Sequence, residues 1–326
     1  MVAWKAVSKA ATWGSAGQVS ATASMPASAA GLCSGASVAS SAIAELSELA
    51  PLHNPAALAG IDAARERFPA APQVAAFDTA FHATLPDHAA TYPLPREWTE
   101  RWGLRRFGFH GLSVQYAVGR AAELLGDAPP RLVVCHLGAG CSVTAVHAGR
   151  SIDTSMGFTP LEGLMMARRS GSVDPGLLLY LLARGIQPGE LDQALNERSG
   201  LLGVSGVSAD MRKVLSAEAA GDPRARLAVD LFVHRLVATI GGMIPGLGGL
   251  DALIFTGGIG EHSAVVRARA AARLSYLGLA LDVAANDAAA GDGALSTPDS
   301  LVRVLVISAR EDLSVLAEVK RVLGAR

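Results

Sequence analysis

Phe255-Thr256-Gly257-Gly258-Ile259-Gly260-Glu261-His262 is the stretch of sequence that decides the fold. The apolar residues 251–256 predict a buried strand, residues 257–260 a turn, and residues 263–277 a helix. Such a turn brings backbone N–H groups and the positive end of the helix to a crevice where a nucleotide phosphate or sugar could bind. The run is neither a P-loop, because no Lys-Ser or Lys-Thr follows, nor a full Gly-x-Gly-x-x-Gly dinucleotide pattern. A plain strand-to-helix turn fits it equally well.

A second glycine turn lies upstream, in His136-Leu137-Gly138-Ala139-Gly140. Residues 131–136 before it predict a buried strand, and residues 141–146 after it predict a returning strand. Glycine permits positive φ and a close approach of backbone to a ligand, although an ordinary hairpin uses it in the same way. Two such loops, each after an apolar strand, together favour a bound nucleotide.

Strands and helices alternate along the rest of the chain, which predicts an α/β fold built on a sheet. Further strands are expected at residues 73–77 and 301–307. Helices are expected at residues 54–67, 113–126, 174–184, 188–198, 224–244 and 311–323.

Composition places the chain among soluble globular proteins. Its 326 residues are enough for two domains; half of them are apolar and 17% are charged. A formal net charge of −1 creates no field that would draw the chain to nucleic acid or to a membrane. No uninterrupted apolar run reaches membrane-spanning length, because the longest stretches, such as Leu227 to Ile244, are broken by charge, His or Gly. The three cysteines, Cys33, Cys135 and Cys141, match no metal-ligand spacing, so free thiols in a reducing cytoplasm are expected.

The first 41 residues differ from the rest, with 12 Ala, 9 Ser, 4 Gly and no Asp, Glu or Arg. No apolar face repeats there at helix or strand spacing, so residues 1–42 are expected to be low-complexity and disordered. A targeting peptide, a natural flexible tail and a coding accident such as a frameshift are three competing explanations. The excess of 24 Arg over 4 Lys in the whole chain is typical of GC-rich coding and favours the accident.

Two polar residues stand where α/β folds bind ligands. Asp78 follows the strand at 73–77, where a carboxylate could orient a nucleophile or hold Mg²⁺ through water, or simply cap the next turn. His110 lies between glycines in Gly108-Phe109-His110-Gly111. It could donate to a developing negative charge, although such a His is often only a surface residue.

Three further groups carry charge. Arg168 and Arg169 form either a solvated pair or a clamp on a phosphoryl group. Asp210-Met211-Arg212 is typical of a helix start and could also meet a ligand. Glu311 and Asp312 open the last helix, where acids stabilise the helix dipole, and one of them could hold Mg²⁺.

In this order, the motifs resemble those of the acetate kinase family. The resemblance rests on Ala50-Pro51-Leu52-His53-Asn54-Pro55, Phe77-Asp78-Thr79-Ala80-Phe81-His82, Gly108-Phe109-His110-Gly111, Cys135-His136-Leu137-Gly138, Asp153-Thr154-Ser155-Met156-Gly157-Phe158-Thr159-Pro160-Leu161-Glu162-Gly163-Leu164-Met165-Met166, Ser199-Gly200-Leu201-Leu202-Gly203, Asp210-Met211-Arg212 and Phe255-Thr256-Gly257-Gly258-Ile259-Gly260-Glu261. It extends from about residue 43 to the end of the chain, and the run from Asp153 to Met166 is its most specific part.

The resemblance implies an actin/sugar-kinase-like (ASKHA) α/β fold of two domains, a homodimer, and reversible transfer of the ATP γ-phosphoryl group to acetate or another short-chain acid with Mg²⁺. Asp78 would be the active-site carboxylate, and His110 and Arg169 would stabilise the transferring phosphoryl group. Glu311 would hold Mg²⁺. The acid pocket would be lined by Leu52, Phe109 and Pro160. The nucleotide would be bound by His136, Leu137, Gly138, Ala139, Gly140, Asp210, Met211, Arg212, Gly258, Ile259, Gly260, Glu261 and His262.

The resemblance also implies a division into domains. Residues 43–80 together with 311–326 would be a remnant of the first domain. Residues 81–310 would be the second domain, which binds nucleotide and forms the dimer. The family's first domain is larger than this remnant, so an incomplete first domain is expected here.

Several positions depart from the family's pattern, mostly those that would face ligands. The chain contains neither the family's phosphate-binding Asn-Ala-Gly-Ser-Ser-Ser-Leu-Lys run nor its substrate-binding Arg within His-Arg-Val-Val-His-Gly-Gly. Ala139, His262 and Arg310 each replace an Asn, Leu112 replaces a Thr, and Val114 replaces a His.

Two hypotheses of different classes follow. One is an active acetate kinase-like phosphotransferase, and the other is a truncated, catalytically inactive family remnant that still dimerises. A regulator that binds phosphate or nucleotide is a third alternative. The missing amino-terminal loop separates the first two, and its absence predicts little or no phosphoryl transfer by the isolated chain.

Overall fold

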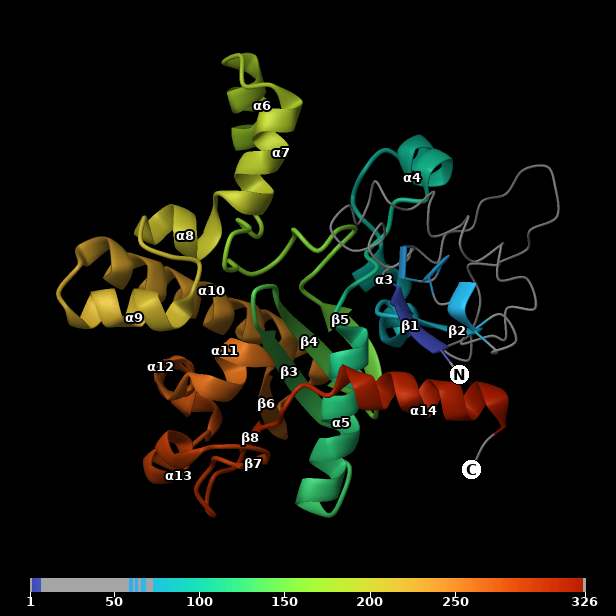
Figure 1. The fold of residues 1–326 in the computed structure, drawn as a ribbon. Helices are drawn as coiled ribbons and strands as arrows, with labels where there is room; N and C mark the ends of the chain where they lie inside the picture. The colour runs from blue at the N-terminus through green and yellow to red at the C-terminus, as the bar shows by residue number, and fades with distance from the viewer. Residues whose placement is uncertain (1, 7–58, 61, 64–65, 69–72, 325–326) are drawn as a thin grey trace. The chain divides into compact units, whose positions relative to one another are not determined.

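The chain forms two compact units. The computed structural model describes residues 2–6, 59–60, 62–63, 66–68 and 73–324. The smaller unit comprises residues 1–116 with 310–326, and the larger unit comprises residues 117–309. The chain passes from one to the other inside helix α5 (Gly111–Leu125) and again just after Ala309, as can be followed by colour in Figure 1.

A six-stranded mixed sheet forms the core of the larger unit, in the order β5-β4-β3-β6-β8-β7. Its central strands β3, β6 and β8 are parallel, whereas β4 and β5 continue from β3 as antiparallel neighbours and β7 is antiparallel to β8. The apolar strands β3 and β6 are buried along almost their whole length, as expected of parallel strands in the middle of a sheet. The bounds are β3 Arg131–Leu137, β4 Cys141–His147, β5 Arg150–Thr154, β6 Ala252–Thr256, β7 Gly293–Ala294 and β8 Arg303–Val306.

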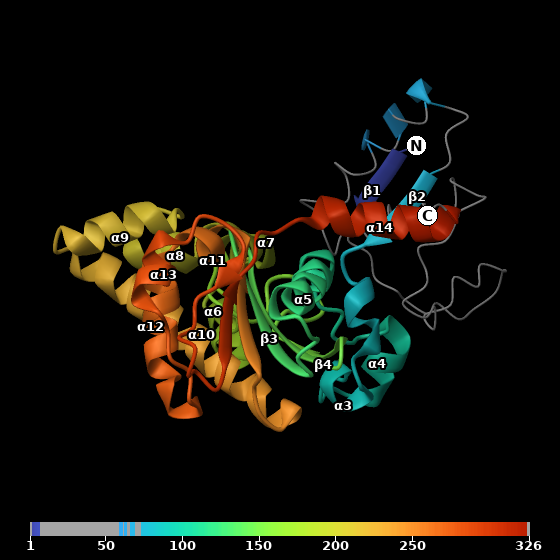
Figure 2. The same ribbon diagram turned by 90° about the horizontal axis from the view of Figure 1, so that it is seen from below.

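Helices surround this sheet. The helices of the larger unit, beyond the end of α5, are α6 Pro175–Ala183, α7 Pro188–Glu197, α8 Gly200–Ser205, α9 Met211–Ala219, α10 Pro223–Leu247, α11 Gly257–His262, α12 Ala264–Arg273, η2 Ser275–Leu277 and α13 Val283–Ala288. Asp222 begins α10 by accepting hydrogen bonds from the N–H groups of Arg224 and Ala225 at 2.8 and 3.2 Å. The buried face of α10 packs against β3, β4 and β5. Helices α8, α9 and α12 pack against α10, and Figure 2 shows them gathered with it beside the sheet.

The strands and helices expected within the described residues are present, with two corrections. Residues 257–260 do not form a separate turn, because helix α11 begins at Gly257. Only Gly257 in this run has positive φ, at 76°, so the chain turns once and is helical at the next residue. The helix expected over 263–277 is divided into α12 and η2. Most of the helix expected at 54–67 lies outside the described residues.

Among the described residues, α10 is the one helix long and apolar enough to cross a membrane by length and composition. Core helices meet the same criterion, and 39% of the most apolar window of α10 is buried inside the structure. The packing of α10 on the sheet accounts for the buried part of its apolar surface.

The smaller unit contains a two-stranded parallel sheet of β1 (Val2–Ala6) and β2 (Gln73–Phe77). Helix α14 (Glu311–Leu323) packs against both strands. The short helices are η1 Ala80–Thr84, α3 Asp87–Ala90 and α4 Arg96–Trp102. Strand β1 belongs to the segment 1–42, whose other residues lie outside those described, so disorder there stays a prediction, as does the domain division.

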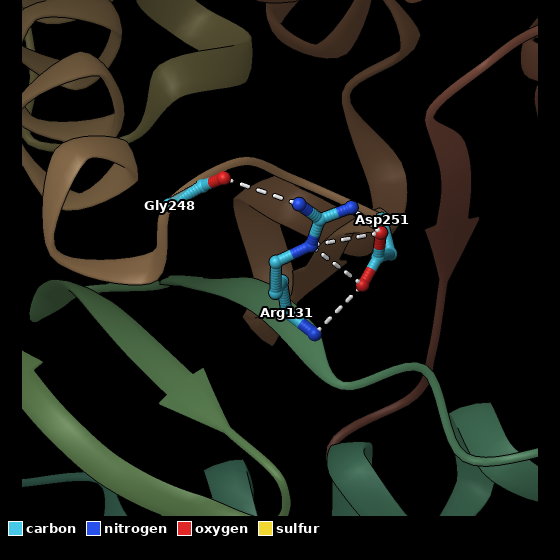
Figure 3. A network of polar contacts seen from close by, with 3 residues as sticks. All are labelled: Arg131, Gly248 and Asp251. Carbon is cyan, nitrogen blue, oxygen red and sulfur yellow. Dashed lines mark hydrogen bonds and ion pairs between the residues drawn. The ribbon is translucent and has the colours of Figure 1, made fainter.

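An ion pair fixes the starts of the central strands, as Figure 3 shows. The carboxylate of Asp251 accepts hydrogen bonds from the backbone N–H of Arg131 at 2.9 Å and from its Nε at 3.0 Å, and also pairs with its Nη2. Arg131 Nη1 donates to the carbonyl of Gly248 at 3.1 Å, where α10 ends. The backbone of Asp251 in turn accepts from the N–H of Arg303 at 2.8 Å. One residue thus ties together the first residues of three parallel strands.

We expect Asp251→Ala to lower the free energy of unfolding by about 2 kcal/mol, because it removes charge-assisted hydrogen bonds to both the backbone and the guanidinium of Arg131. The measurement is urea unfolding followed by circular dichroism. Glu100→Ala, which breaks the exposed pair Arg96–Glu100, is the control and should cost less than about 0.5 kcal/mol. Equal losses in the two variants would contradict this role of Asp251.

Candidate active site

The residues expected to act in phosphoryl transfer belong to different units. The smaller unit contains Asp78, Phe109, His110 and Glu311. The larger unit contains Pro160, Arg169 and all the expected nucleotide-binding residues. Leu52 lies outside the described residues.

Asp78 follows β2 directly and is 3% exposed. Its Oδ2 accepts a hydrogen bond from the backbone N–H of His110 at 2.8 Å, and its carbonyl accepts from the N–H of Gly111 at 2.8 Å. A Cβ at position 111 would lie 2.3 Å from that carbonyl oxygen, so only glycine permits the approach. The structure therefore brings together two motifs that lie 32 residues apart in the sequence.

His110 has a strained backbone. Its φ is 60°, and among the described residues only Ala148 shares a positive φ without being glycine. This conformation costs on the order of 1–2 kcal/mol in an ordinary residue. Here the N–H of His110 is bound by Asp78, and its carbonyl accepts from the N–H of Val114 at 2.9 Å. Backbone strain that neighbouring groups hold in place is common at functional sites, which makes His110 a candidate site residue.

His82, which the sequence did not indicate as a site residue, contacts the backbone of this turn. Its Nε2 lies 3.0 Å from the carbonyl of Phe109 and must donate to it, because a carbonyl only accepts. Burial lowers the pKa of His82 from 6.5 to about 4, against smaller raising effects of the Phe109 hydrogen bond and the charge of Asp78. His82 is thus neutral at pH 7. The motif Phe77–His82 contained this residue, but nothing in the local sequence indicates its contact with Phe109.

The two glycine loops meet in the larger unit. Strands β3 and β6 pair in register from Leu132 with Ala252 to His136 with Thr256, so both end at the same edge of the sheet. A Cβ at Gly257 would lie 2.9 Å from the carbonyl of Leu137, and one at Gly138 would lie 3.9 Å from the N of Gly258. Ala139 and Gly258 are exposed at this edge. The exposed backbone of these two motifs, one of them at the start of α11, is a candidate surface for phosphate or sugar oxygens.

A buried arginine holds the end of α11. Arg267 is 1% exposed, and its Nη1 donates to the carbonyls of Gly260 at 2.8 Å and Glu261 at 2.6 Å. Its Nε and Nη2 donate to the side chain and the carbonyl of Asn286, both at 2.8 Å. Burial lowers the pKa of Arg267, yet its five donors match these carbonyls well enough to keep it charged. No local pattern in the sequence indicated this residue.

Arg169 is half-buried on the irregular segment after β5. Its Nη1 donates to the carbonyl of Pro160 at 2.7 Å, which fixes the guanidinium against the same loop. Burial lowers the pKa of Arg169, and an arginine with a lowered pKa still remains a cation at neutral pH. The neighbouring Arg168 is exposed. The structure therefore distinguishes the two arginines, and Arg169 is the one held in a defined position.

Asp210 caps α9 and pairs with Arg212. Its Oδ1 accepts from the backbone N–H of Arg212 at 3.0 Å, and its Oδ2 accepts from Arg212 Nη2 at 2.6 Å. These hydrogen bonds lower the pKa of Asp210. The side chain of Met211 is buried, so Asp210 and Arg212 are the members of this motif that can offer polar groups to a ligand.

The described residues fit Mg²⁺ only in combination with a substrate. No group of three or more His, Cys, Asp or Glu side chains that could hold a metal occurs in the part of the chain that the structure describes. Mg²⁺ needs no such group, because it keeps several waters and binds through one or two carboxylates plus substrate phosphates. Glu311, in the first turn of α14, is a carboxylate of this kind.

Comparisons with known proteins agree with the motifs. The sequence matches the model of the Acetokinase family over residues 35–317. Acetate kinase of Nostoc punctiforme is 56% identical over 277 residues, which are 84% of this chain and 68% of that protein. Acetate kinase of a Cyanothece species is 55% identical over 277 residues, with the same coverage of 84% and 68%.

Solved structures agree as well. Acetate kinase of Porphyromonas gingivalis superposes with a TM-score of 0.83 and 39% identity, covering 87% of this chain and 72% of that one. A propionate kinase of Francisella tularensis superposes with a TM-score of 0.81 and 41% identity, covering 86% of this chain and 72% of that one. Acetate kinase of Entamoeba histolytica superposes with a TM-score of 0.83 and 34% identity, covering 88% of this chain and 76% of that one. These likenesses confirm the expected family resemblance and the actin/sugar-kinase-like α/β fold class.

We expect His82 to make the protein less stable in acid. Its pKa is about 4 when folded and 6.5 when unfolded, so between these values the unfolded chain binds a proton that the folded chain does not. Stability is therefore complete above pH 6.5 and falls as the pH drops towards 4. At pH 5 the loss from His82 alone should be about 2 kcal/mol.

His82→Gln is the informative variant, since its amide can still donate to the carbonyl of Phe109 without titrating. Urea unfolding at pH 7 and pH 5 should show a smaller difference for the variant than for the wild type. An identical pH dependence in both proteins would contradict the assignment.

Proposed function

We propose how this chain, which belongs to the acetokinase family and is an acetate kinase-like phosphotransferase, carries out its reaction. The site residues bind ATP and Mg²⁺ and pass the γ-phosphoryl group reversibly to acetate or another short-chain acid. One observation carries these residue assignments. The N–H of Ala167 donates to the carbonyl of Ala139 at 3.2 Å, which attaches the Arg169 turn to a glycine loop at the sheet edge. A cation and a phosphate-binding backbone thus lie on one connected structure.

Phosphoryl transfer to a carboxylate requires positioned charges and no base. A short-chain carboxylic acid is ionised at neutral pH, so its oxygen attacks the γ-phosphorus without losing a proton. A new O–P bond forms while the bond to the β-phosphate oxygen breaks, and ADP leaves with the electron pair. Because the negative charge spreads over the equatorial oxygens of the phosphoryl group, catalysis depends on cations and N–H donors directed at them.

We assign this stabilisation to Arg169 and His110. The bond to Pro160 uses one of the five N–H donors of Arg169 and orients the rest of the guanidinium. The strained backbone of His110, held by Asp78, orients the imidazole. In this proposal Asp78 acts by positioning His110 and by its negative charge towards water or Mg²⁺, not as a proton acceptor.

Glu311 would hold Mg²⁺, which when bound neutralises charge on the nucleotide phosphates. The nucleotide itself would be bound by the segment His136–Gly140, by Gly258–His262 in α11 and by Asp210–Arg212. Phe109 and Pro160 would line the acid pocket with Leu52, as the family resemblance implies. Phe109 is buried, and the same Pro160 whose carbonyl fixes Arg169 would then limit the size of the acid.

The protein is proposed to work in the cytoplasm. Cys135 and Cys141 are free and buried. Burial raises the pKa of both thiols, that of Cys141 to about 12, so both are protonated and unreactive. Neighbouring thiols that stay unoxidised fit a reducing compartment.

We expect the isolated 326-residue polypeptide to form acetyl phosphate from ATP and acetate slowly, because these residues contain neither an Asn-Ala-Gly-Ser-Ser-Ser-Leu-Lys run nor a His-Arg-Val-Val-His-Gly-Gly segment. A chimera that carries the amino-terminal segment of the Nostoc punctiforme relative should turn over faster by on the order of 10² or more. The measurement is a coupled ATP-plus-acetate assay with Mg²⁺. In the chimera, Asp78→Asn should lower kcat by on the order of 10².

Asp87→Asn, an exposed acid at the start of α3, is the matched control and should leave kcat unchanged. Equal turnover by the 326-residue polypeptide and the chimera would show that the added amino-terminal segment is dispensable. An inactive chimera would favour the alternative of a catalytically inactive remnant.

We further propose that the protein is a homodimer in which α6 pairs with α6 of a second copy. Helix α6 is apolar throughout, yet none of its residues is buried. Its exposed side chains are Leu177, Leu179, Tyr180 and Leu182, here called the α6 surface. Figure 1 shows α6 lying against α7, which leaves its other side uncovered by the larger unit. A patch of this kind is self-complementary when two copies meet on a two-fold axis.

We expect Leu179→Glu to convert the dimer into a monomer, because it places a charge in the centre of the α6 surface, where Leu179 is 68% exposed in the single chain. Size-exclusion chromatography with light scattering gives the mass directly. Leu301→Glu is the control, since Leu301 is 80% exposed outside this surface. A wild type that runs as a monomer, or a dimer that survives Leu179→Glu, would contradict the assignment.

A further inference from the structure

The turn that carries Arg169 has all its carbonyl groups bound. The carbonyls of Met166, Ala167 and Arg168 accept hydrogen bonds from the N–H groups of Leu201 at 2.8 Å, Leu202 at 3.1 Å and Ser199 at 2.8 Å, respectively. The carbonyl of Arg169 accepts from the N–H of Met166 at 3.1 Å. Four consecutive carbonyls are therefore fixed, three of them by a single short stretch of chain.

That stretch is the start of α8. The first N–H groups of a helix have no partner inside the helix and need acceptors elsewhere. In α8 the carbonyls of the Arg169 turn supply them. Ser199 is itself held by its Oγ, which donates to the carbonyl of Ala194 in α7 at 2.7 Å. The N–H groups at the start of α8 and the carbonyls of the Arg169 turn are thus each other's partners. A movement of either segment would leave N–H groups and carbonyls unpaired.

Gly200 is the point of closest approach between them. Its φ is 64°, and a Cβ at this position would lie 2.2 Å from the carbonyl oxygen of Met166 and 2.8 Å from that of Arg169. Both obstacles are backbone atoms, which cannot rotate away as a side chain could. Any other residue at 200 would push the Arg169 turn away from α8 and turn the guanidinium from its contact with Pro160.

We propose that Gly200, with the first turn of α8, is the positioning residue for Arg169. This inference rests on the proposed function, in which Arg169 stabilises the transferring phosphoryl group. It gives a role to the motif Ser199-Gly200-Leu201-Leu202-Gly203, none of whose residues is proposed to touch a ligand. Gly200 acts through the backbone of residues 166–169, so its effect must disappear when Arg169 has no guanidinium to position.

A double-mutant cycle tests this dependence. The proteins are the wild type, Gly200→Ala, Arg169→Ala and the double variant. ATP formed from acetyl phosphate and MgADP is read by luminescence, which detects slow turnover, and binding of inorganic phosphate is measured by calorimetry alongside. Gly200→Ala should lower kcat by on the order of 10², as expected for a misplaced catalytic group. In the Arg169→Ala background the same change should alter kcat by less than about threefold.

Gly206→Ala is the matched control. Gly206 ends the same helix with nearly the same φ, 66°, but its Cβ would meet only the flexible guanidinium of Arg224 at 3.4 Å. It carries the same backbone penalty without touching the Arg169 turn, so its kcat should stay within about threefold of the wild type. Thermal unfolding of each variant separates loss of fold from loss of position.

If Gly200→Ala does not fold, Leu201→Ala replaces it in the cycle. Leu201 is fully buried, and its truncation loosens α8 while keeping both the glycine and the N–H donors. Its smaller loss of kcat, about tenfold, should likewise vanish in the Arg169→Ala background. Losses that are equal in both backgrounds would overturn the role of Gly200. Equal rates and equal phosphate binding in the wild type and Arg169→Ala would instead overturn the proposed function of Arg169, and the positioning role with it.

Discussion

The in-register parallel pairing of β3 and β6 is the constraint on which the rest of the larger unit depends. Because His136 pairs with Thr256, both strands end at one edge of the sheet, and the chain leaves each through a glycine loop. The close contact of Gly257 with the carbonyl of Leu137 leaves no room for a side chain, so α11 begins at once. Arg267 then binds the carbonyls at the end of α11. One strand register therefore determines two loops, a helix and a buried guanidinium.

Stability and binding are assigned to opposite ends of this strand pair. At the amino ends, Arg131 and Asp251 satisfy each other's charges and tie β3 to β6 and β8. At the carboxyl ends, Ala139 and Gly258 are exposed, so the backbone there is open to a ligand. Parallel sheets bind ligands at their carboxyl ends for this reason. A change at the amino ends should alter folding and leave the loops in place, because the strands between them are buried and rigid.

The sequence predicted the strands and the turn at residues 138–140, because apolar runs bounded by glycine are local patterns. The resemblance to acetate kinases predicted the fold class, which the comparisons confirm. Local patterns did not show that residues 257–260 are helical, nor that Arg267 is buried against Asn286, since those depend on packing. The strained backbone of His110 depends on Asp78, 32 residues away, and no propensity encodes such a contact. The assignment of site residues stays a prediction.

In each unit, a glycine that admits no Cβ lies against the backbone of a turn that contains a proposed site residue. Gly111 lies against the carbonyl of Asp78 in one unit, and Gly200 lies against that of Met166 in the other. The departures from the family's pattern, such as Ala139 for an Asn, replace side chains and leave these glycines in place. A replaced side chain removes one donor or acceptor, whereas a replaced glycine would move the backbone of a whole turn. The geometry of the proposed site can therefore persist in a chain whose ligand-facing side chains have changed.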